Sequence, residues 1–431
     1  MLLLLLLLLL LLALAHSAAA LPAGVWSKVT LDLSVYPLAR CLDGSPGAMY
    51  IFPGDSQYVL HLQGGGYCTS LADCAARAAF PVYSGEASIG STSAWSAGGV
   101  PCSHALASSM PPCASDGGSG GLLSANASLN PTFATATKVW LGYCDGGGFS
   151  GTLPAPVAVN ATHSVHFAGS FILDALLDTL LAAHGMASAS AVVLKGCSAG
   201  GASAFSHADS VAGAVARGTG GAARYAAVPG AGFLLDTPPY AGQANLFTPM
   251  VQWVYASMGA NASGNAACTA AHEAQQPGSG WRCLIAQHVL PYIASPLFVA
   301  NSAADAAQLT LVMRLGCWPP SGSCNASQLA YLDAFHATMV QQLAPVLHSS
   351  GRRHGAFVAE CAVHMMENVD GMVGAIHVQG LLLKDVLGAW WEAASTAPVA
   401  AVDEPWTAGG GQFGGNAECG SYGPLPSWPT Y

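Results

Sequence analysis

The sequence predicts an α/β fold in which helices flank a mostly parallel central sheet. Three observations support this class: short apolar runs of strand length, helical segments between them, and turn residues where the runs end. Strands and helices that alternate at this spacing are typical of a parallel sheet. The expected strands are residues 58–62, 138–143, 191–195, 296–300 and 356–359. The expected helices are residues 171–186, a stretch from the serine motif described below to about 217, residues 329–348, and residues 369–391 as a mainly helical segment.

Local signals support each element in turn. The strand at 58–62 ends at a triple glycine, and the strand at 138–143 ends at Cys144-Asp145-Gly146. In the helix at 171–186, leucines recur on one apolar face and Gly185 provides a stop.

The composition first suggests a membrane protein, because 52% of the 431 residues are hydrophobic and only 8% are charged. However, beyond residue 20 there is no run of about 18 or more apolar residues, so we expect no stable membrane insertion. The aromatic content argues against disorder, and the net charge of −10 without basic runs argues against a nucleic-acid partner. We expect a monomer with one domain over residues 21–400 and an irregular Gly/Pro-rich tail over 401–431.

Residues 1–20 have the pattern of a secretory signal peptide, since an almost pure leucine run is followed by small residues. We therefore expect a secreted, extracellular or cell-wall protein. In that compartment the thirteen cysteines should be mostly disulfide-bonded, with at least one left over. Proximity favours the pairs Cys68–Cys74, Cys102–Cys113, Cys268–Cys283 and Cys317–Cys324. Candidate glycosylation sites are the four sequons at Asn126, Asn160, Asn261 and Asn325.

A metal centre is not expected, because the chain contains no Cys-x-x-Cys pair. The spacing nearest to one is Cys361-x-x-His364. We likewise expect no other cofactor.

The strongest local motif is the G-x-S-x-G pattern of residues 196–200, which lies between an expected strand and an expected helix. In α/β-hydrolases this context forms a sharp turn that exposes a nucleophilic serine, here Ser198. The flanking positions must be small because larger side chains would collide at the turn. The sequence therefore predicts an α/β-hydrolase-like, disulfide-stapled domain.

A serine nucleophile needs a histidine base and a carboxylate that orients it. Asp305 and His364 each follow a later expected strand, in the order Ser, Asp, His that α/β-hydrolases use. Other candidates fit less well: His336, His348 and His377 fall in or at the end of expected helices, His354 precedes its strand, Asp333 is helical, and Asp145 comes before the serine.

The site also needs backbone donors for the developing oxyanion. One is the N–H of Ala199, directly after the nucleophile. The glycine loop after the strand at 58–62 supplies the others, and we expect Gly65, Gly66 and Tyr67 to contribute.

These motifs resemble those of plant pectin acetylesterases. The matching segments are CLDGSP at 41–46, HLQGGGYC at 61–68 with Cys74, YCDG at 143–146, KGCSAGG at 195–201, LPYIASPLFVANSAAD at 290–305 and CAVH at 361–364. The resemblance extends from about residue 28 to about 395. The chain departs from the family pattern at Tyr67, Ala208, Ala304 and Met365.

The resemblance implies that Ser198, Asp305 and His364 form the triad, that Cys41 pairs with Cys144 and Cys68 with Cys74, and that the chain hydrolyses acetyl esters of a pectin-like polysaccharide. Two alternatives stay open: a lipid-ester protein deacylase similar to animal Notum, and a non-catalytic secreted wall-binding protein on the same scaffold. A polygalacturonan is anionic like this chain, so its attraction depends on whether Arg77, Arg282, Arg352 and Arg353 gather at the cleft.

Overall fold

The computed structural model describes residues 21–79, 82–83, 86–87, 89–95, 120–348, 353–393, 399–408 and 416–419. Within these residues one large sheet contains β1 (Ser27–Thr30), β2 (Ala48–Phe52), β3 (Asp55–Leu62), β6 (Ala136–Leu141), β9 (Ala191–Cys197), β10 (Arg224–Gly230), β11 (Leu297–Ser302), β12 (His354–Ala359) and β15 (Val399–Val402). The strand order is β1-β2-β6-β3-β9-β10-β11-β12-β15. The pairs β1–β2 and β2–β6 are antiparallel, and every later pair is parallel. The predicted fold class is confirmed.

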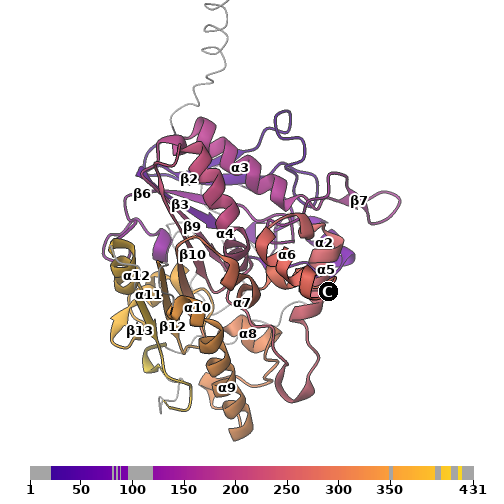
Figure 1. Cartoon of the computed structure of the whole chain (residues 1–431). Helices are drawn as coiled ribbons and strands as arrows, with labels where there is room; N and C mark the ends of the chain where they lie inside the picture. The colour runs from indigo at the N-terminus through magenta and orange to yellow at the C-terminus, as the bar shows by residue number, and fades with distance from the viewer. Residues whose placement is uncertain are drawn as a thin grey trace, which may run out of the picture.

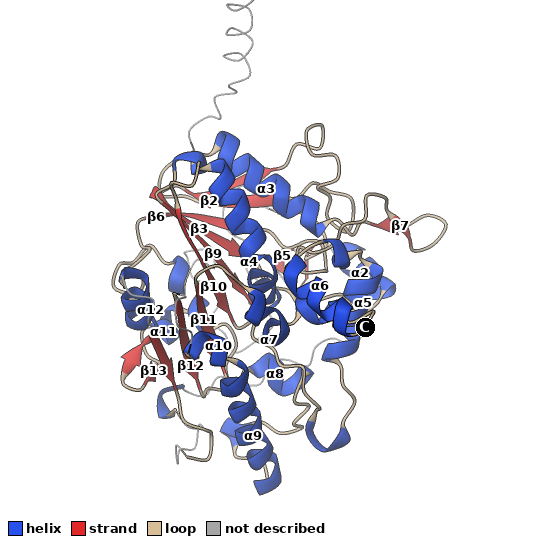
Figure 2. Cartoon of the chain, in the orientation of Figure 1, coloured by secondary structure: helices blue, strands red, loops and turns tan. Residues whose placement is uncertain are grey.

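The described helices alternate with these strands (Figure 2). They are α2 (Leu71–Ala79), α3 (Gly169–Ala183), α4 (Ala199–Gly218), α5 (Phe247–Ser257), α6 (Ala266–Gln275), α7 (Ala286–Val289), α8 (Ala306–Leu311), α9 (Ala326–Gln342), α10 (Ala344–Leu347), α11 (Asp370–Val373) and α12 (Leu383–Glu392). Three short hairpins complete the described structure: β4 (Val82–Tyr83) with β5 (Glu86–Ala87), β7 (Val157–Ala158) with β8 (Ser164–Val165), and β13 (His377–Val378) with β14 (Leu381–Leu382).

Helices cover both faces of the sheet (Figure 1). Side chains of α3, α4 and α9 belong to one apolar core, and those of α11 and α12 belong to a second core on the opposite face. Val192 and Leu194 of β9 face the first core, whereas Val193 between them faces the second. Since successive side chains of a strand point to opposite faces, a strand buried between two layers is apolar throughout. This explains the continuous apolar run at 191–195.

The helix expected at 369–391 is wrong in its middle part. Its ends are the helices α11 and α12, and the hairpin β13–β14 lies between them. The two residues of the hairpin turn, Gln379 and Gly380, have φ values of 54° and 77°. Positive φ at both turn positions defines the tight turn that joins antiparallel strands and is incompatible with a helix. His377, expected in mid-helix, therefore lies in a strand.

The helix expected at 329–348 consists of two helices, α9 and α10. It begins earlier than predicted because Asn325 and Gln328 form a capping box. It breaks at Leu343, since Pro345 has no N–H to continue the helical hydrogen bonds. The last sheet strand, β15, lies across the boundary expected at residue 400, and His354 opens β12 rather than preceding it.

Five disulfides connect described residues: Cys41–Cys144, Cys68–Cys74, Cys268–Cys283, Cys317–Cys324 and Cys361–Cys419. The pairs implied by the resemblance are formed, as are two of the other pairs expected from proximity. Cys102 and Cys113 lie outside the described residues. The Cys361–Cys419 bridge ties the C-terminal region to the segment after β12.

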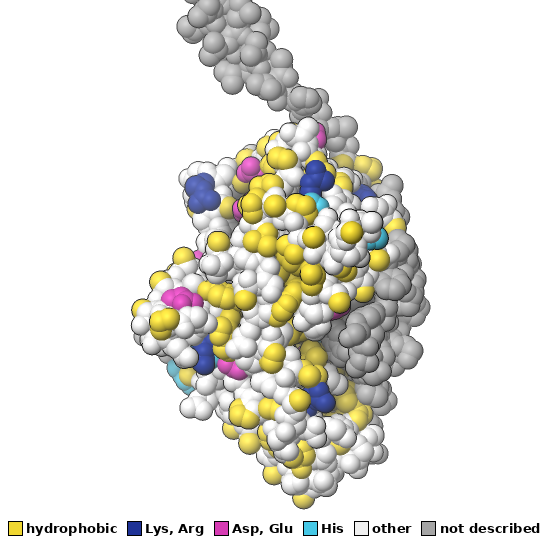
Figure 3. Space-filling view, turned by 90° about the vertical axis from the view of Figure 1, so that its right-hand side faces the viewer, with side chains coloured by type: hydrophobic (Ala, Val, Ile, Leu, Met, Phe, Trp, Pro, Cys, Tyr) yellow, Lys and Arg dark blue, Asp and Glu magenta, His cyan; other side chains and the backbone are white. Residues whose placement is uncertain are grey.

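No helix in the described part of the chain is long and apolar enough to cross a membrane. Charged groups are sparse on the surface that carries α5 and α6, where they stand singly among uncharged and apolar side chains (Figure 3).

The packing of α4 on the sheet requires glycine at one position and tolerates alanine at another. A Cβ on Gly201 would lie 2.1 Å from the carbonyl oxygen of Gly230, whereas a Cβ on Gly213 would meet only the Arg217 guanidinium at 3.3 Å. We expect Gly201→Ala to lower the free energy of unfolding by about 3 kcal/mol or more because backbone must shift. Gly213→Ala in the same helix should raise it by up to about 1 kcal/mol through helix propensity.

Urea unfolding of both variants measures this difference. Equal effects of the two substitutions would contradict the close packing of α4 against β10.

Candidate active site

Ser198 occupies a strained turn between β9 and α4. Its backbone has φ 55° and ψ −126°, a conformation that non-glycine residues adopt mainly at functional sites. A Cβ on Gly196 would lie 2.1 Å from the carbonyl oxygen of Gly200, and a Cβ on Gly200 would lie 2.1 Å from that of Leu62. Both outer glycines of the motif are therefore sterically required, as the sequence predicts. The turn is held by the Ser198 N–H, which donates to the Gly230 carbonyl at 3.1 Å.

Asp305 and His364 meet at the carboxyl edge of the sheet, as expected from their positions after β11 and β12. Asp305 Oδ2 accepts a hydrogen bond from His364 Nδ1 at 2.7 Å, and both side chains are buried. The other carboxylate oxygen, Oδ1, caps α8 by accepting the N–H groups of Ala307 at 2.8 Å and Gln308 at 3.2 Å. The carboxylate is thus fixed from both sides, and its negative charge lies at a helix N-terminus.

The bond to Asp305 determines which nitrogen of His364 can act as a base. Since Nδ1 donates to Asp305, the neutral ring carries its lone pair on Nε2. Nε2 is buried and has no hydrogen-bond partner within the described structure. Burial disfavours the imidazolium, but the charge and hydrogen bond of Asp305, with a contribution from Glu367, raise the pKa of His364 above its ordinary value.

The segments that carry Ser198 and His364 touch each other through their neighbours. Cys197, Ala231 and Met365 form a small buried cluster, so the residue before Ser198 packs with the residue after His364. Ala231 and Met365 also have positive φ, at 47° and 59°. No hydrogen bond joins the described side chains of Ser198 and His364, and such contacts often form only with substrate bound.

The glycine loop lies directly on this turn. A Cβ on Gly64 would be 2.9 Å from Ser198 Cβ, so the loop can approach only as glycine. Gly65 and Gly66 have φ values of 155° and 67°. Among described groups, the N–H groups of Gly65, Gly66, Tyr67 and Ala199 donate to no acceptor, and Ala199 directly follows Ser198. They remain the predicted donors to an oxyanion.

Arg77, which the sequence suggested only as a possible cation at the cleft, and Tyr143 orient this loop. Arg77 of α2 donates to the carbonyl oxygens of Gly65 at 2.9 Å and Tyr67 at 2.8 Å, and it is paired with Asp73 at 3.2 Å. The hydroxyl of Tyr143 donates to the Gly66 carbonyl oxygen. In a trans peptide the N–H points away from the carbonyl. Because Arg77 holds the Gly65 carbonyl, the N–H of Gly66 points away from Arg77. Because Tyr143 holds the Gly66 carbonyl, the N–H of Tyr67 points away from Tyr143.

A buried polar cluster lies beneath Ser198. The Lys195 ammonium donates to Asn368 Oδ1 and lies 3.3 Å from His61 Nδ1, while His61 Nε2 lies 3.7 Å from Cys197 Sγ. Cys197 is the one described cysteine outside a disulfide. Burial lowers the pKa of Lys195 and raises that of Cys197 to about 11, so the thiol stays protonated.

Glu367 adds a second carboxylate near His364. It is fully buried, and neither carboxylate oxygen has a hydrogen-bond partner among described groups. Its Oε1 would be 2.1 Å from a Cβ on Gly230, the residue whose carbonyl holds Ser198. Burial raises the pKa of Glu367, whereas the charge of Lys195 lowers it. No local sequence signal marks Glu367, because its role depends on tertiary packing.

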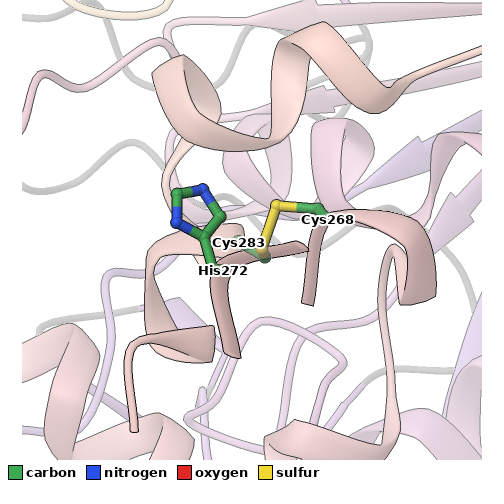
Figure 4. Close-up of side chains that lie close together, drawn as sticks. All are labelled: Cys268, His272 and Cys283. Carbon is green, nitrogen blue, oxygen red and sulfur yellow. A yellow bond between two sulfur atoms is a disulfide. The ribbon is translucent and has the colours of Figure 1, made fainter. Parts of the chain in front are cut away.

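Cys268, His272 and Cys283 lie close enough together to suggest a metal site (Figure 4). However, Cys268 and Cys283 are joined as a disulfide, and disulfide sulfurs are not the thiolates that bind metals. The cluster is therefore structural. The four sequon asparagines, Asn126, Asn160, Asn261 and Asn325, are all exposed, and their glycosylation remains a prediction.

Three comparisons with known proteins all find esterases of the pectinacetylesterase and Notum type. The family model described as "Pectinacetylesterase" matches residues 26–99 and 103–410. "Pectin acetylesterase 11" of Arabidopsis thaliana is 27% identical over 348 residues, which cover 78% of each chain. "Palmitoleoyl-protein carboxylesterase NOTUM" of Drosophila melanogaster is 25% identical over 272 residues, covering 62% of this chain and 36% of the relative. A solved structure of the Wnt deacylase Notum from Drosophila superposes with a TM-score of 0.71 at 20% identity, over 88% of this chain and 96% of that one.

Tyr143→Phe tests the orientation of the glycine loop. Without the hydroxyl the Gly66 carbonyl is released, so the Tyr67 N–H loses its fixed direction. We expect kcat for p-nitrophenyl acetate to fall about 10- to 100-fold, less than complete loss of an oxyanion donor. Tyr225→Phe is the matched control, since Tyr225 also donates to a backbone carbonyl, that of Ala208 at 2.8 Å. A similar loss of kcat in both variants would contradict the role of Tyr143.

Glu367→Gln tests the second carboxylate through the pH profile. Activity needs neutral His364, so it falls as the pH drops through the pKa of His364. Removing the Glu367 charge lowers that pKa, and the acid limb of kcat/KM should move to lower pH. Glu360→Gln removes another buried carboxylate of the same segment, one that binds His336 at 2.6 Å, and should leave the acid limb in place. If the acid limb of the kcat/KM profile does not move in Glu367→Gln, the Glu367 charge does not raise the pKa of His364.

Proposed function

Because the chain belongs to the pectinacetylesterase family and is a carboxylic ester hydrolase, we propose that it is a secreted serine esterase that removes acetyl groups from a pectin-like polysaccharide. The observation that carries the proposal is the buried Asp305–His364 hydrogen bond at the sheet edge where the strained Ser198 turn also lies.

The proposed mechanism assigns one role to each group. Ser198 Oγ attacks the acetyl carbonyl carbon while His364 Nε2 takes its proton. The carbonyl oxygen becomes an oxyanion, which the N–H groups of Ala199, Gly66 and Tyr67 bind. The C–O bond to the sugar then breaks, and His364 returns the proton to the leaving hydroxyl.

Water completes the reaction on the acetyl-enzyme. His364 removes a proton from the water as it attacks the acyl carbon, and the same N–H groups bind the second oxyanion. Collapse releases acetate and returns the proton to Ser198. Asp305 keeps Nδ1 protonated and stabilises the imidazolium at each stage.

The five disulfides between described residues support an extracellular location, because such bonds persist mainly in oxidising compartments. The exposed sequons and the leucine-rich segment at 1–20 agree with this proposal.

A small cavity lies beside Tyr67. It is about the size of one water molecule, and the residues that line it include Ser150, Ser203, Val251, Val254 and Leu284. The same cavity is bordered by Gly147 and Gly148, so the backbone approaches closely on that side.

Ser198→Ala tests the assignment of the nucleophile. We expect kcat on p-nitrophenyl acetate to fall about 10⁴-fold or more, because no acyl-enzyme can form. Ser210→Ala, an exposed change in the same helix, should leave kcat unaltered. Acetate release from pectin, acetylated xylan and acetylated chitin, measured side by side, identifies the carrier of the ester.

Chain-length preference separates the alternatives. Faster turnover of octanoyl than of acetyl p-nitrophenyl ester would favour a Notum-like lipid deacylase. If Ser198→Ala retained full esterase activity, the triad would be wrong, and a protein without any esterase activity would point to a wall-binding role.

A further inference from the structure

We propose that the site takes acetyl esters carried by uncharged sugar chains, including methyl-esterified pectin, and discriminates against polygalacturonate. This inference rests on the proposed acetylesterase function and narrows its substrate. It follows from where the chain places its few cations, because a polysaccharide with one carboxylate on each sugar is bound most readily by several Lys or Arg side chains.

The sequence limits how many cations the site can have. The chain contains twelve Lys and Arg residues, and the segments outside the described structure contribute only Arg352. The segment 96–119 near the glycine loop in sequence contains none. Eleven cations can therefore be placed.

Several cations lie at the amino ends of the parallel strands, whereas the candidate site lies at their carboxyl ends. Arg224 opens β10 and lies over the Trp391 ring at 3.6 Å. Arg353 directly precedes β12 and donates to the carbonyls of Trp390 and Trp391 at 2.9 and 2.7 Å. Arg217 is in the last turn of α4, a 20-residue helix about 30 Å long that starts beside Ser198. Arg224 and Arg353 are therefore at the opposite ends of the parallel strands from Ser198, which directly follows the carboxyl end of β9.

Other cations are committed to internal bonds. Arg77, the candidate nearest the site, is held by Asp73 and by the carbonyls of the glycine loop. Lys195 is buried beneath the nucleophile. The remaining cations of this kind bind backbone carbonyls elsewhere: Lys28 those of Thr92 and Trp95, Arg40 those of Pro37 and Gly44, Lys138 those of Ala134 and Ala136, and Lys384 that of Ser128.

Two cations remain, Arg282 and Arg314. Arg282 lies 5.2 Å from the centre of the Trp281 ring. After the hydrogen bond from His288, it also helps to hold the pKa of Asp236 below its usual range, so its charge has an acidic neighbour. Arg314, which follows α8, has no hydrogen bond, ion pair or ring contact with a described group. A single arginine cannot neutralise a run of carboxylates.

The surface that carries α5 and α6 agrees with this account. Apolar and uncharged side chains run down the middle of this face, and basic side chains stand apart from one another around them (Figure 3). With a net charge of −10 the molecule as a whole also repels a polyanion.

The experiment compares one polymer in two charge states. Acetylated polygalacturonan is assayed for acetate release before and after methyl esterification of its carboxylates, at pH 7 where most histidines are neutral. We expect kcat/KM to be about ten-fold higher for the methyl-esterified form at low salt. The gap should narrow from about 10 mM to about 1 M salt, because the Debye length falls from about 30 Å to about 3 Å.

Arg314→Gln is expected to preserve the preference for the uncharged polymer. A free-acid polymer that reacts as fast as the methyl ester, with a rate that falls as salt rises, would overturn the inference, as would loss of free-acid activity alone in Arg314→Gln. Hydrolysis of p-nitrophenyl acetate by the same preparation separates the two proposals: a protein that releases acetate from neither polymer nor from this small ester lacks the proposed function itself.

Discussion

The close approach of backbone around Ser198 is the constraint on which the rest of the site depends. The turn brings β3, β9, β10 and α4 within distances that admit no side chain at Gly196, Gly200 or Gly201. This packing fixes the Ser198 N–H on the Gly230 carbonyl and places the start of α4 beside the nucleophile. It also sets the glycine loop, which follows β3, against Cys197 and Ser198. The same close packing therefore positions both Ser198, the proposed nucleophile, and the glycine loop that carries the proposed oxyanion donors.

Charge is sparse in this chain, and much of it is used inside the fold. Asp145 is buried beside the glycine-rich segment after β6, and burial raises its pKa to about 6. Lys195 and Glu367 lie buried beneath the site with opposite charges that influence each other. An unpaired buried charge costs several kcal/mol, so these groups must be retained against a stability penalty. Few ionisable side chains therefore lie on the surface, and several of those in the chain are buried around the candidate site.

The residues that the sequence proposed for the site are those with local signals. Ser198 lies in a short motif between a strand and a helix, and Asp305 and His364 follow recognisable strands. Arg77, Tyr143 and Glu367 could not be found in this way, because each acts on a residue that is distant in sequence or has no pattern of its own. The hairpin at 377–382 was missed for a different reason: its apolar residues fit a helix equally well, and only the left-handed turn at Gln379 and Gly380 decides between the two.

Two histidine–carboxylate pairs lie near the end of β12, and their surroundings distinguish them. Glu360 directly follows the strand and binds His336, but burial raises its pKa to about 7 and its Oε1 has no described partner. Against the effect of burial, Glu360 still raises the pKa of His336, so the two pairs differ in their surroundings and not in the presence of a carboxylate partner.

Asp305, in contrast, accepts two backbone N–H groups at the start of α8 as well as His364. The two histidine–carboxylate pairs also differ in how their segments lie relative to Ser198. β12 lies three strands from β9, or about 14 Å at the usual spacing. The segment after Cys361 reaches toward Ser198, because Met365 belongs to the same buried cluster as Cys197 and Ala231, whereas Glu360 directly follows its own strand. Among the described histidines, His364 combines a carboxylate partner that is fixed on both sides with a segment that shares a buried cluster with the Ser198 turn, which supports its proposed role as the base.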